Sequence, residues 1–449
     1  MIRERRGCKL YALVIIAVFA GCLAACSQNV STVRPPPVTG EELLTLAQEQ
    51  TFKYFWDYGH PVSGMARERD NGRDLITVTT GGTGFGVMAI LAGAKRGFIT
   101  REEAVTRLTV VVDFLREKAT AYHGAYAHWI NGNTGATIPF SPDDNGADLV
   151  ETAFLFQGLL AAYEYFKTGT DPAEAALCGK IQAMWEAVEW DWFTRNGENR
   201  LYWHWSPNKE WIMNMPLRGW NETLIVYVLA AASPTHGITK DVYNGWGGGS
   251  IVTNQSFYGI RLPMGGFQKG GPLFFTHYSF MGLDPRGLKD ENVDYWEQVT
   301  AQAKINYLYC VENPLKYSGY GPNAWGLTAS NTDDGYNASA PVANRSMDKG
   351  IIAPTGALSS FPYTPDESMA ALEHYYNDRR EMLWGKYGFY DAFRPDGTWY
   401  DTGYLAIDQG PIVVMIENYR SGLLWRLFMG NEDIRNGLSK LGFTSDPGD

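Results

Sequence analysis

The sequence predicts an all-α fold, a double ring of helices called an (α/α)6 toroid. Two kinds of helical segment alternate along the chain, and about six of them are apolar nearly all round. A helix that is apolar on every side must be buried on every side, so these six are expected to form an inner ring inside the amphipathic ones. A helical-repeat solenoid and an unclosed bundle are the rival arrangements. No repeat consensus recurs at a fixed period, which ranks the solenoid lower.

The amphipathic segments carry apolar residues three and four positions apart, which leaves one face buried and the other in water. They comprise 101–118, 172–190 and 290–312. The apolar segments are rich in small residues and comprise 83–95, 148–165, 221–232, 271–282, 366–376 and 409–422. A glycine-rich stretch at 80–86 enters the first apolar segment without a strand–helix–strand context, which favours close helix packing over a dinucleotide site.

The segments that enter the apolar helices are loop-like and carry polar and aromatic residues. They span 69–82, 131–147, 202–220, 244–270, 313–366 and 385–408. The loop at 313–366 is far longer than ordinary connections, which indicates a functional role. Loops at one mouth of a helical ring would form a groove, and we expect the chemistry there.

The beginning of the chain predicts a lipoprotein signal. Arg3, Arg5, Arg6 and Lys9 precede an apolar run from Leu10 to Ala20, which is too short to span a bilayer. The sequence LAAC that follows resembles a lipobox, with Cys26 as the lipidated residue; an ordinary secretory signal cut near Ala25 is the alternative. Residues 1–25 are thus a predicted signal peptide, 26–40 a Pro-rich tether, and 41–449 a single catalytic domain.

The composition of the 449 residues narrows the class of protein. A hydrophobic content of 45% with 19% charged residues excludes a disordered chain, and five Cys cannot form a dense disulfide framework. The net charge is −11, and removing residues 1–25, which carry +3, leaves −14. Such an acidic surface repels nucleic acid. Fifteen Trp, 26 Tyr and 21 Phe are many, and their flat apolar rings suit sugars as well as a core.

A first group of acids lies where one apolar helix begins. Asp144, Asp148 and Glu151 are spaced i, i+4 and i+7, so they share a face if the helix extends that far back. Helix capping and the helix dipole explain the two aspartates without any function. They do not explain Glu151, which lies in a strongly apolar run. We therefore assign Glu151 a catalytic role and the two aspartates a substrate-binding role.

Two more acids begin other apolar helices. Glu222 follows Arg218 and Trp220 in RGWNET, and an apolar setting beside an indole would raise its pKa toward that of a general acid. Asp408 lies in AIDQGP, where an N-cap is an equally good interpretation. Both are predicted catalytic residues, whereas Arg218 and Trp220 are predicted to bind substrate.

The loops supply the remaining candidates. Trp325, Asp333 and Asp334 lie in the long loop, and Trp203 lies in the 202–220 loop; all four are predicted to bind substrate. A tight turn is a simpler explanation of the two aspartates. The sequence contains no HExxH, P-loop, CxxC or GxSxG motif, and its seven His show no metal spacing. Carboxylates with aromatic residues, and no metal or cofactor, indicate glycoside hydrolysis.

At these residues the chain resembles a known family. The stretches DDNGADLVET, RGWNET, GPNAWGLTASNTDDGY and AIDQGP are similar to the bacterial glycoamylase-like proteins of glycoside hydrolase family 144. The resemblance spans roughly residues 42–442. It implies an (α/α)6 toroid that cleaves β-1,2-glucan, either internally or by releasing the disaccharide sophorose. It also implies a substrate-binding cluster at Asp144, Asp148 and Glu151, with Glu222 as the acid and Asp408 as the base of an inverting reaction.

Two other functions stay open at this stage. One is a non-catalytic lipoprotein that binds glycans, and the other is a glucoamylase-like hydrolase of a different glucan. In each case we expect a monomer in the bacterial cell envelope, lipid-anchored at the periplasmic or outer-membrane surface.

Overall fold

The protein is described by a computed structural model that covers residues 37–247 and 251–445. One compact unit begins at Val38 and contains every helix and strand given below. The predicted signal peptide, Cys26 and nearly all of the tether lie outside the described residues.

Six helices of the described chain form an inner ring, as predicted. They are α2 (Thr80–Arg96), α4 (Leu149–Phe166), α6 (Leu224–Ala232), α8 (Phe274–His277), α10 (Pro354–Leu358) and α13 (Ala406–Ser421). Helix α2 packs against α4 and α13, α4 against α6, and α10 against α13. The α8 region closes the ring: Ser279 accepts from the backbone N–H of Ile225 in α6, and Tyr363 after α10 donates to the carbonyl of Thr276.

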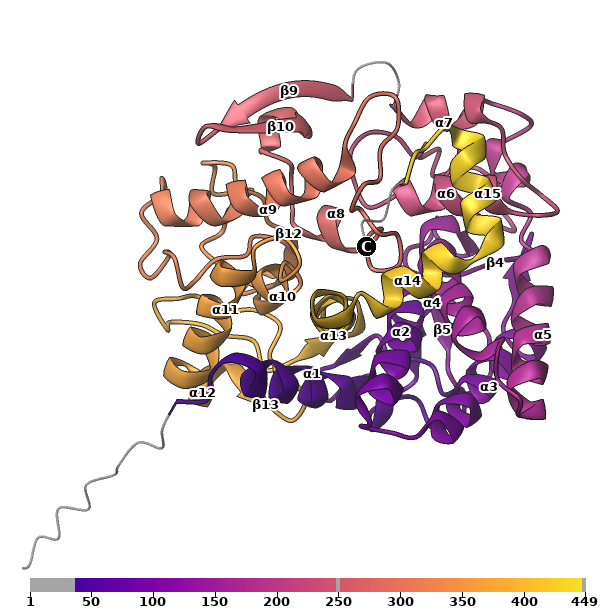
Figure 1. Cartoon of the computed structure of the whole chain (residues 1–449), viewed down its shortest axis with the longest axis horizontal. Helices are drawn as coiled ribbons and strands as arrows, with labels where there is room; N and C mark the ends of the chain where they lie inside the picture. The colour runs from indigo at the N-terminus through magenta and orange to yellow at the C-terminus, as the bar shows by residue number, and fades with distance from the viewer. Residues whose placement is uncertain (1–36, 248–250, 446–449) are drawn as a thin grey trace, which may run out of the picture. The chain divides into compact units, whose positions relative to one another are not determined.

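Outer helices precede the inner ones along the chain. They are α1 (Gly40–Trp56), α3 (Arg101–Glu117), α5 (Pro172–Glu186), α7 (Lys240–Gly247), α9 (Tyr295–Glu312) and α11 (Pro365–Glu373). Short α12 (Arg380–Leu383), α14 (Leu423–Gly430) and α15 (Glu432–Leu441) complete the set. Figure 1 shows α13 end-on near the middle of the view, with α1, α5 and α9 toward the rim. The predicted (α/α)6 toroid is confirmed.

Two predicted inner helices are wrong in detail. The segment 366–376 belongs to outer α11, which buries only one face, and the inner helix is the fully buried α10 just before it. The segment 271–282 is helical only in α8. Gln157 of α4 explains the early end, because its side chain donates to the carbonyl of Tyr278 and accepts from the N–H of Gly282. These two backbone groups therefore bond to a side chain instead of continuing a helix.

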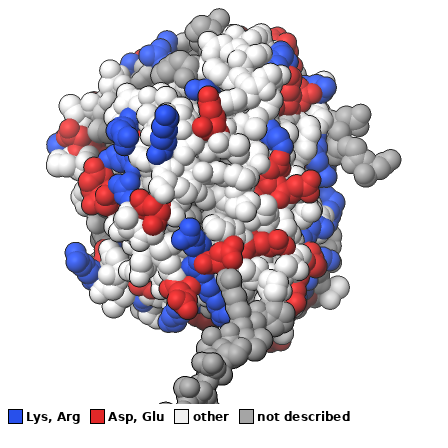
Figure 2. All heavy atoms as spheres, turned by 90° about the vertical axis from the view of Figure 1, so that its left-hand side faces the viewer, with Lys and Arg blue, Asp and Glu red and all other residues white. Residues whose placement is uncertain are grey.

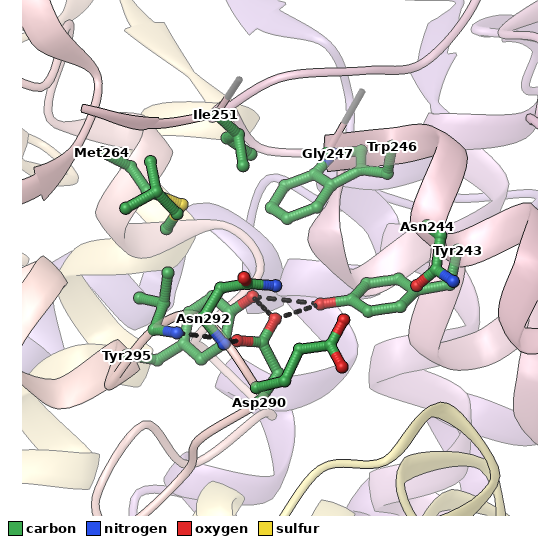
Figure 3. Close-up of a pocket in the computed structure, with 12 residues that line it drawn as sticks. Tyr243, Asn244, Trp246, Gly247, Ile251, Met264, Asp290, Asn292 and Tyr295 are labelled. Atoms are coloured by element: carbon green, nitrogen blue, oxygen red, sulfur yellow. Dashed lines mark hydrogen bonds between the residues drawn. The ribbon is translucent and has the colours of Figure 1, made fainter. Parts of the chain in front are cut away.

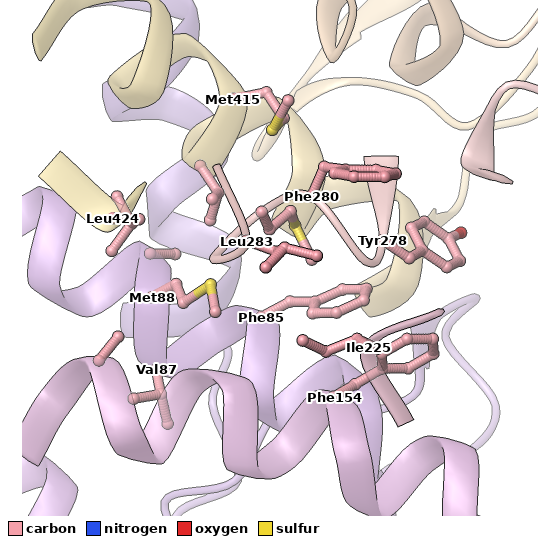
Figure 4. Packing of buried hydrophobic residues seen from close by; sticks show 14 of the residues in the cluster. Phe85, Val87, Met88, Phe154, Ile225, Tyr278, Phe280, Leu283, Met415 and Leu424 are labelled. Atoms are coloured by element: carbon pink, nitrogen blue, oxygen red, sulfur yellow. The ribbon is translucent and has the colours of Figure 1, made fainter. Parts of the chain in front are cut away.

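The centre of the ring is a packed aromatic and aliphatic core (Figure 4). The rings of Phe85, Phe154 and Tyr278 lie 5.2–5.6 Å apart between centroids. Helices α2 and α4 approach so closely that a Cβ on Gly84 would lie 2.0 Å from the carbonyl oxygen of Phe154. The glycine-rich stretch thus serves helix packing, as predicted.

Short strands line the mouth of the ring. Three of them run directly into inner helices: β2 (Thr77–Thr79) into α2, β7 (Ala147–Asp148) into α4, and β15 (Tyr404–Leu405) into α13. Each has an antiparallel partner at the mouth, namely β5 (Trp129–Asn131), β8 (His204–Trp205) and β1 (Arg69–Asp70). Strand β6 (Thr137–Ile138) extends the β2–β5 pair. A hairpin of β11 (Ala329–Thr332) and β12 (Gly335–Ala338) lies in the long loop. These pairings fix where the inner helices start.

The remaining strands form separate hairpins. They are β3 (Ala121–Tyr122) with β4 (Ala125–Tyr126), β9 (Val252–Phe257) with β10 (Ile260–Met264), and β13 (Trp384–Gly385) with β14 (Gly388–Phe389). On the face shown in Figure 2, acidic and basic side chains are interspersed, so the negative net charge is not gathered there. Within the described residues, no helix has the length and apolar character needed to cross a bilayer.

Candidate active site

A cavity of about 330 Å³ opens at the strand-lined mouth, and we call it the central cavity. Its walls come from β2, β5, α4, β12 and β15, which are distant in sequence. The ionisable side chains that line it are Glu68, Arg69, His128, Glu151, Glu222, Tyr278 and Tyr336. Flat rings from Trp129, Phe140, Phe154, Trp203 and Phe274 cover much of the rest. The cavity combines charged groups with aromatic faces of the size of a sugar ring.

Asp148 is the N-cap of α4 and lies behind this wall. Its Oδ1 accepts from the backbone N–H groups of Val150 and Glu151 at 3.0 and 2.9 Å and from the indole N–H of Trp203 at 2.8 Å. Its Oδ2 accepts from Nδ1 of His128 at 3.1 Å. Burial alone would raise the pKa of Asp148, but the hydrogen bond from His128 and the nearby His204 outweigh it and lower that pKa. Asp148 therefore stays ionised.

Glu151 and Asp144 have fewer donors. The Glu151 carboxylate accepts from the N–H of Gly81 at 2.6 Å and from Thr79 Oγ1 at 3.2 Å. Burial raises the pKa of Glu151 above its usual value. Asp144 is buried 3.5 Å from Nε2 of His204, and burial together with the charge of Asp148 raises its pKa to about 7. The three predicted acids are thus close neighbours, and their surroundings shift their pKa values in different directions.

His128 links these acids and was not predicted from the sequence. Besides its hydrogen bond to Asp148, its Nε2 lies 3.9 Å from Glu151. Burial opposes its positive charge, but Glu151 and Asp148 raise the pKa of His128 to about 9. An imidazolium at this point balances part of the local negative charge. The only sequence signal is its place in AYAHWIN, where polar and apolar residues alternate in the manner of a strand.

Glu222 lines the same cavity from the turn before α6. Its backbone carbonyl is held by the hydroxyl of Ser279 at 2.5 Å. Burial raises the pKa of Glu222 to about 7, and the charges of Asp148 and Glu151 act in the same direction. A carboxyl that keeps its proton near neutral pH can act as a general acid.

Asp408 lies in the first turn of α13, next to the cavity-lining Ile407, and is only 2% exposed. Its carboxyl lies within hydrogen-bonding reach of that of Asp391, a residue that the sequence did not single out. Burial and the charge of Asp391 raise the pKa of Asp408 far above its usual value. The charges of both Asp408 and Glu222 act on the hydroxyl of Tyr278 in the cavity wall. The two predicted catalytic acids therefore flank one cavity.

Besides Asp144 and Asp148, five predicted substrate-binding residues do not line this cavity: Arg218, Trp220, Trp325, Asp333 and Asp334. Trp325 is fully buried, packs against Tyr307 and donates to the carbonyl of Glu367, so it is a core residue and not a sugar platform. Trp220 is also buried, with its indole N–H on Gln302 at 2.7 Å. Asp333 and Asp334 form the exposed turn of the β11–β12 hairpin.

The exposed residues among these five either form ion pairs or border a different surface depression. Asp333 pairs with Arg394 at 2.8 Å and Asp334 with Lys349 at 2.7 Å. Arg218 is exposed beside a shallow surface depression that Trp220 also borders. Of the predicted aromatic binders, Trp203 does line the central cavity.

A cation could contact three of these side chains. One ligand atom each from His128, Asp144 and Asp148 lies within 4.8 Å of the others. His128 and Asp148 already satisfy each other, so a cation would have to replace their hydrogen bond. That the protein needs no metal or cofactor stays a prediction.

A second cavity, of about 350 Å³, contains none of the predicted site residues, and we call it the Tyr243 cavity (Figure 3). Asp290 lies at its centre and accepts from the hydroxyls of Tyr243 and Tyr295 at 2.6 and 3.0 Å. The backbone N–H groups of Asn292 and Val293 donate to its other oxygen, both at 2.8 Å. Four donors leave this carboxylate with no unsatisfied acceptor.

Comparison with known proteins places the chain among glycoamylase-like proteins. A family model described as glycoamylase matches residues 214–432. The chain is 47% identical over 436 residues to an exo β-1,2-glucooligosaccharide sophorohydrolase (non-reducing end) from Parabacteroides distasonis. The match covers 92% of this chain and 60% of that protein, so the chain spans about three fifths of the relative's length.

Solved structures agree with this grouping. An endo-β-1,2-glucanase from Chitinophaga pinensis, in complex with sophorotriose and glucose, is 52% identical with a TM-score of 0.88, over 91% of this chain and 99% of that one. A β-1,2-glucanase from Parabacteroides distasonis is 45% identical with a TM-score of 0.87, over 90% of this chain and 60% of that one. An endo-β-1,2-glucanase from Talaromyces funiculosus, 14% identical with a TM-score of 0.63 over 89% and 90% of the chains, shares the fold alone.

Proposed function

Because the chain belongs to the glycoamylase-like proteins of glycoside hydrolase family 144, we propose that it hydrolyses β-1,2-glucan with inversion at the anomeric carbon. One observation carries the proposal: Glu222, whose pKa is raised to about 7, and the buried Asp408 flank a single aromatic-lined cavity. The relatives named above support the choice of substrate.

Glu222 is the proposed acid. Near neutral pH its carboxyl keeps a proton, which it gives to the glycosidic oxygen as the bond to the departing sugar breaks. Asp408 is the proposed base, taking a proton from the water that attacks the opposite face of the sugar. Attack from that face inverts the anomeric configuration.

The other groups bind and orient the sugar. Glu151 and the neighbouring Asp144 supply acceptors for glucose hydroxyl groups. Ionised Asp148 is fully buried and its four donors satisfy it, so it orients His128 and Trp203 instead of contacting the sugar. His128 limits the repulsion among the three acids. Trp203 and the unpredicted rings of the lining offer flat faces for stacking. A third catalytic role for Glu151 is not needed in this scheme, and we place it with the binding acids.

The test is release of reducing sugar from β-1,2-glucan, run beside starch and laminarin. We expect turnover on β-1,2-glucan alone, with products of inverted configuration by NMR at early times. Binding without turnover would favour the glycan-binding lipoprotein, and turnover on starch would favour a glucoamylase. The length of the first products separates internal cleavage from release of sophorose.

We further propose a lipid-anchored monomer at the cell envelope. The lipobox-like LAAC before Ser27 supports lipidation of Cys26, and the Pro-rich tether supports a domain held off the membrane. Replacing Cys26 by Ser should move the protein from the membrane fraction to the soluble fraction. Continued membrane association of that variant would refute the anchor, and a dimer mass in solution would refute the monomer.

A further inference from the structure

The carboxyls of Asp391 and Asp408 meet in a buried position beside the central cavity. Each residue is 2% exposed, and the two carboxyls lie within hydrogen-bonding reach of each other. Asp391 Oδ1 and Asp408 Oδ2 are buried and receive no hydrogen bond from any donor group in the described chain. A buried carboxylate oxygen without a donor is costly, and two such charges in contact are more so.

The surroundings do not supply a free counter-charge. Arg69 is near both carboxyls, but its guanidinium is already bound by Glu68, at 2.8 Å between Nη2 and Oε1. Asp391 Oδ2 accepts from the backbone N–H of Asn331 at 2.7 Å, which is a single neutral donor. The ionisable groups that face the pair are Glu68, Arg69, Tyr278, Tyr336 and Asp401.

We propose that Asp391 and Asp408 hold one proton between them, and that Asp391 is a positioning residue that makes the pair the proton acceptor. The inference rests on the proposed role of Asp408 as base. One shared O–H supplies the donor that the two unsatisfied oxygens lack, and it leaves a single negative charge in place of two. In agreement with this, burial raises the pKa of both carboxyls, that of Asp391 to about 7.

A shared proton resolves a difficulty with Asp408 as base. A lone buried carboxyl would be protonated and unable to accept, whereas the singly ionised pair can take one more proton. As the water oxygen bonds to the anomeric carbon, its proton passes to the pair, which becomes neutral. The bond from that carbon to the leaving oxygen breaks, and this oxygen takes the proton of Glu222. Exchange with solvent then returns a proton to Glu222 and removes one from the pair.

Asp391 also connects the pair to the cavity wall. Asn331, its hydrogen-bond donor, lies in β11 directly opposite Tyr336 of β12, and Tyr336 lines the cavity. The side chain of Asn331 is held separately by Asp401, at 2.6 Å between Nδ2 and Oδ2. The position of the hairpin and the orientation of Asp391 are therefore set together.

The sharpest variant is Asp391→Asn, because the amide reproduces a protonated Asp391. Its oxygen can accept from Asn331 while its NH₂ donates to Asp408. We expect Asp391→Asn to keep kcat within about tenfold of the wild type, whereas Asp408→Asn loses about 100- to 10,000-fold. In Asp391→Leu, Asp408 is left without a partner, and the acid limb of kcat/KM should move up by about one pH unit or more.

Infrared spectroscopy detects the proton shared by Asp391 and Asp408 and does not depend on turnover. In difference spectra taken at one pH near 7, the bands of Glu222 and Asp144 cancel, and the wild type should show a carboxylic-acid C=O band that both Asp391→Asn and Asp408→Asn lack. Asp401→Asn is the matched control, since it removes a neighbouring carboxyl and should keep the band.

The outcomes separate the inference from the proposed function. Proton sharing would be overturned if the band were unchanged in Asp391→Asn. It would also be overturned if Asp391→Asn were folded by circular dichroism but as inactive as Asp408→Asn. Full turnover by Asp408→Asn would instead remove Asp408 as base, and the infrared comparison would still decide whether the proton is shared. Should Asp391→Leu fail to fold, the two amide variants and the Asp401 control decide alone.

Discussion

The central cavity and the Tyr243 cavity both contain buried or half-buried carboxyls, but these carboxyls differ in how many hydrogen-bond donors they have. In the Tyr243 cavity, Asp290 receives four hydrogen bonds and has nothing left to offer a ligand. In the central cavity, the Glu222 carboxyl has its own backbone N–H as its one recorded donor among the described residues, and Asp408 keeps one oxygen unsatisfied. The difference indicates that the number of donors around a carboxyl, more than its burial, separates a structural acid from a reactive one.

The strongest test of this comparison exchanges a carboxyl for an amide in the central cavity. Glu222→Gln keeps the shape of the side chain but cannot give up a proton to the leaving oxygen. We expect kcat on β-1,2-glucan to fall by about 100- to 10,000-fold with the melting temperature nearly unchanged. Reducing-sugar assays and thermal unfolding measure the two quantities. Near-native kcat would remove Glu222 as the acid.

The matched change in the other cavity is Asp290→Ala. It leaves the hydroxyls of Tyr243 and Tyr295 with each other as their remaining partner, 3.2 Å apart. We expect the free energy of unfolding in urea to fall by about 1–3 kcal/mol and kcat/KM to stay within about twofold. A large loss of activity in a folded variant would show that the two cavities are coupled and would break the comparison.

The pH profile gives an intermediate effect. Since the acid must be protonated and burial raises the pKa of Glu222 to about 7, kcat/KM should fall about tenfold per pH unit above that value. The raised pKa of Glu222 also affects the stability of the fold. Between the usual pKa of a glutamate and pH 7, the folded state keeps a proton that the unfolded state releases. The free energy of unfolding should therefore decrease as pH rises through this window. An alkaline limb that starts above pH 9 would contradict the assignment.

The smallest effect is expected at the exposed hairpin turn. Asp334 is 65% exposed and its ion pair with Lys349 is screened by water, so Asp334→Asn should change the free energy of unfolding by less than about 1 kcal/mol. Because Asp334 does not line the central cavity, we expect a KM within about twofold of the wild type. A KM that rises tenfold would return Asp334 to the substrate-binding residues.

The sequence predicted the parts of the site that local patterns encode. An acid followed by an apolar helix is visible in one stretch of chain, as at Glu151, Glu222 and Asp408. His128 and Asp391 were missed because they lie in strand and loop segments, and their importance comes only from what the fold packs against them.

Other differences between expectation and structure have the same origin. Trp325 was predicted to bind substrate, but its burial against α9 and α11 is a tertiary feature that the loop sequence does not show. Helix α10 has only five residues, too few for the 3.6-residue period to be read.

The order of the inner helices along the chain has a consequence for synthesis. Asp148 and Glu151 are made early, but α13, which carries Asp408 and packs against both α2 and α10, comes close to the end of the chain. A growing polypeptide therefore lacks a complete set of the proposed reactive groups until its last inner helix docks. The proposed hydrolysis then requires that the whole chain has been made and has folded.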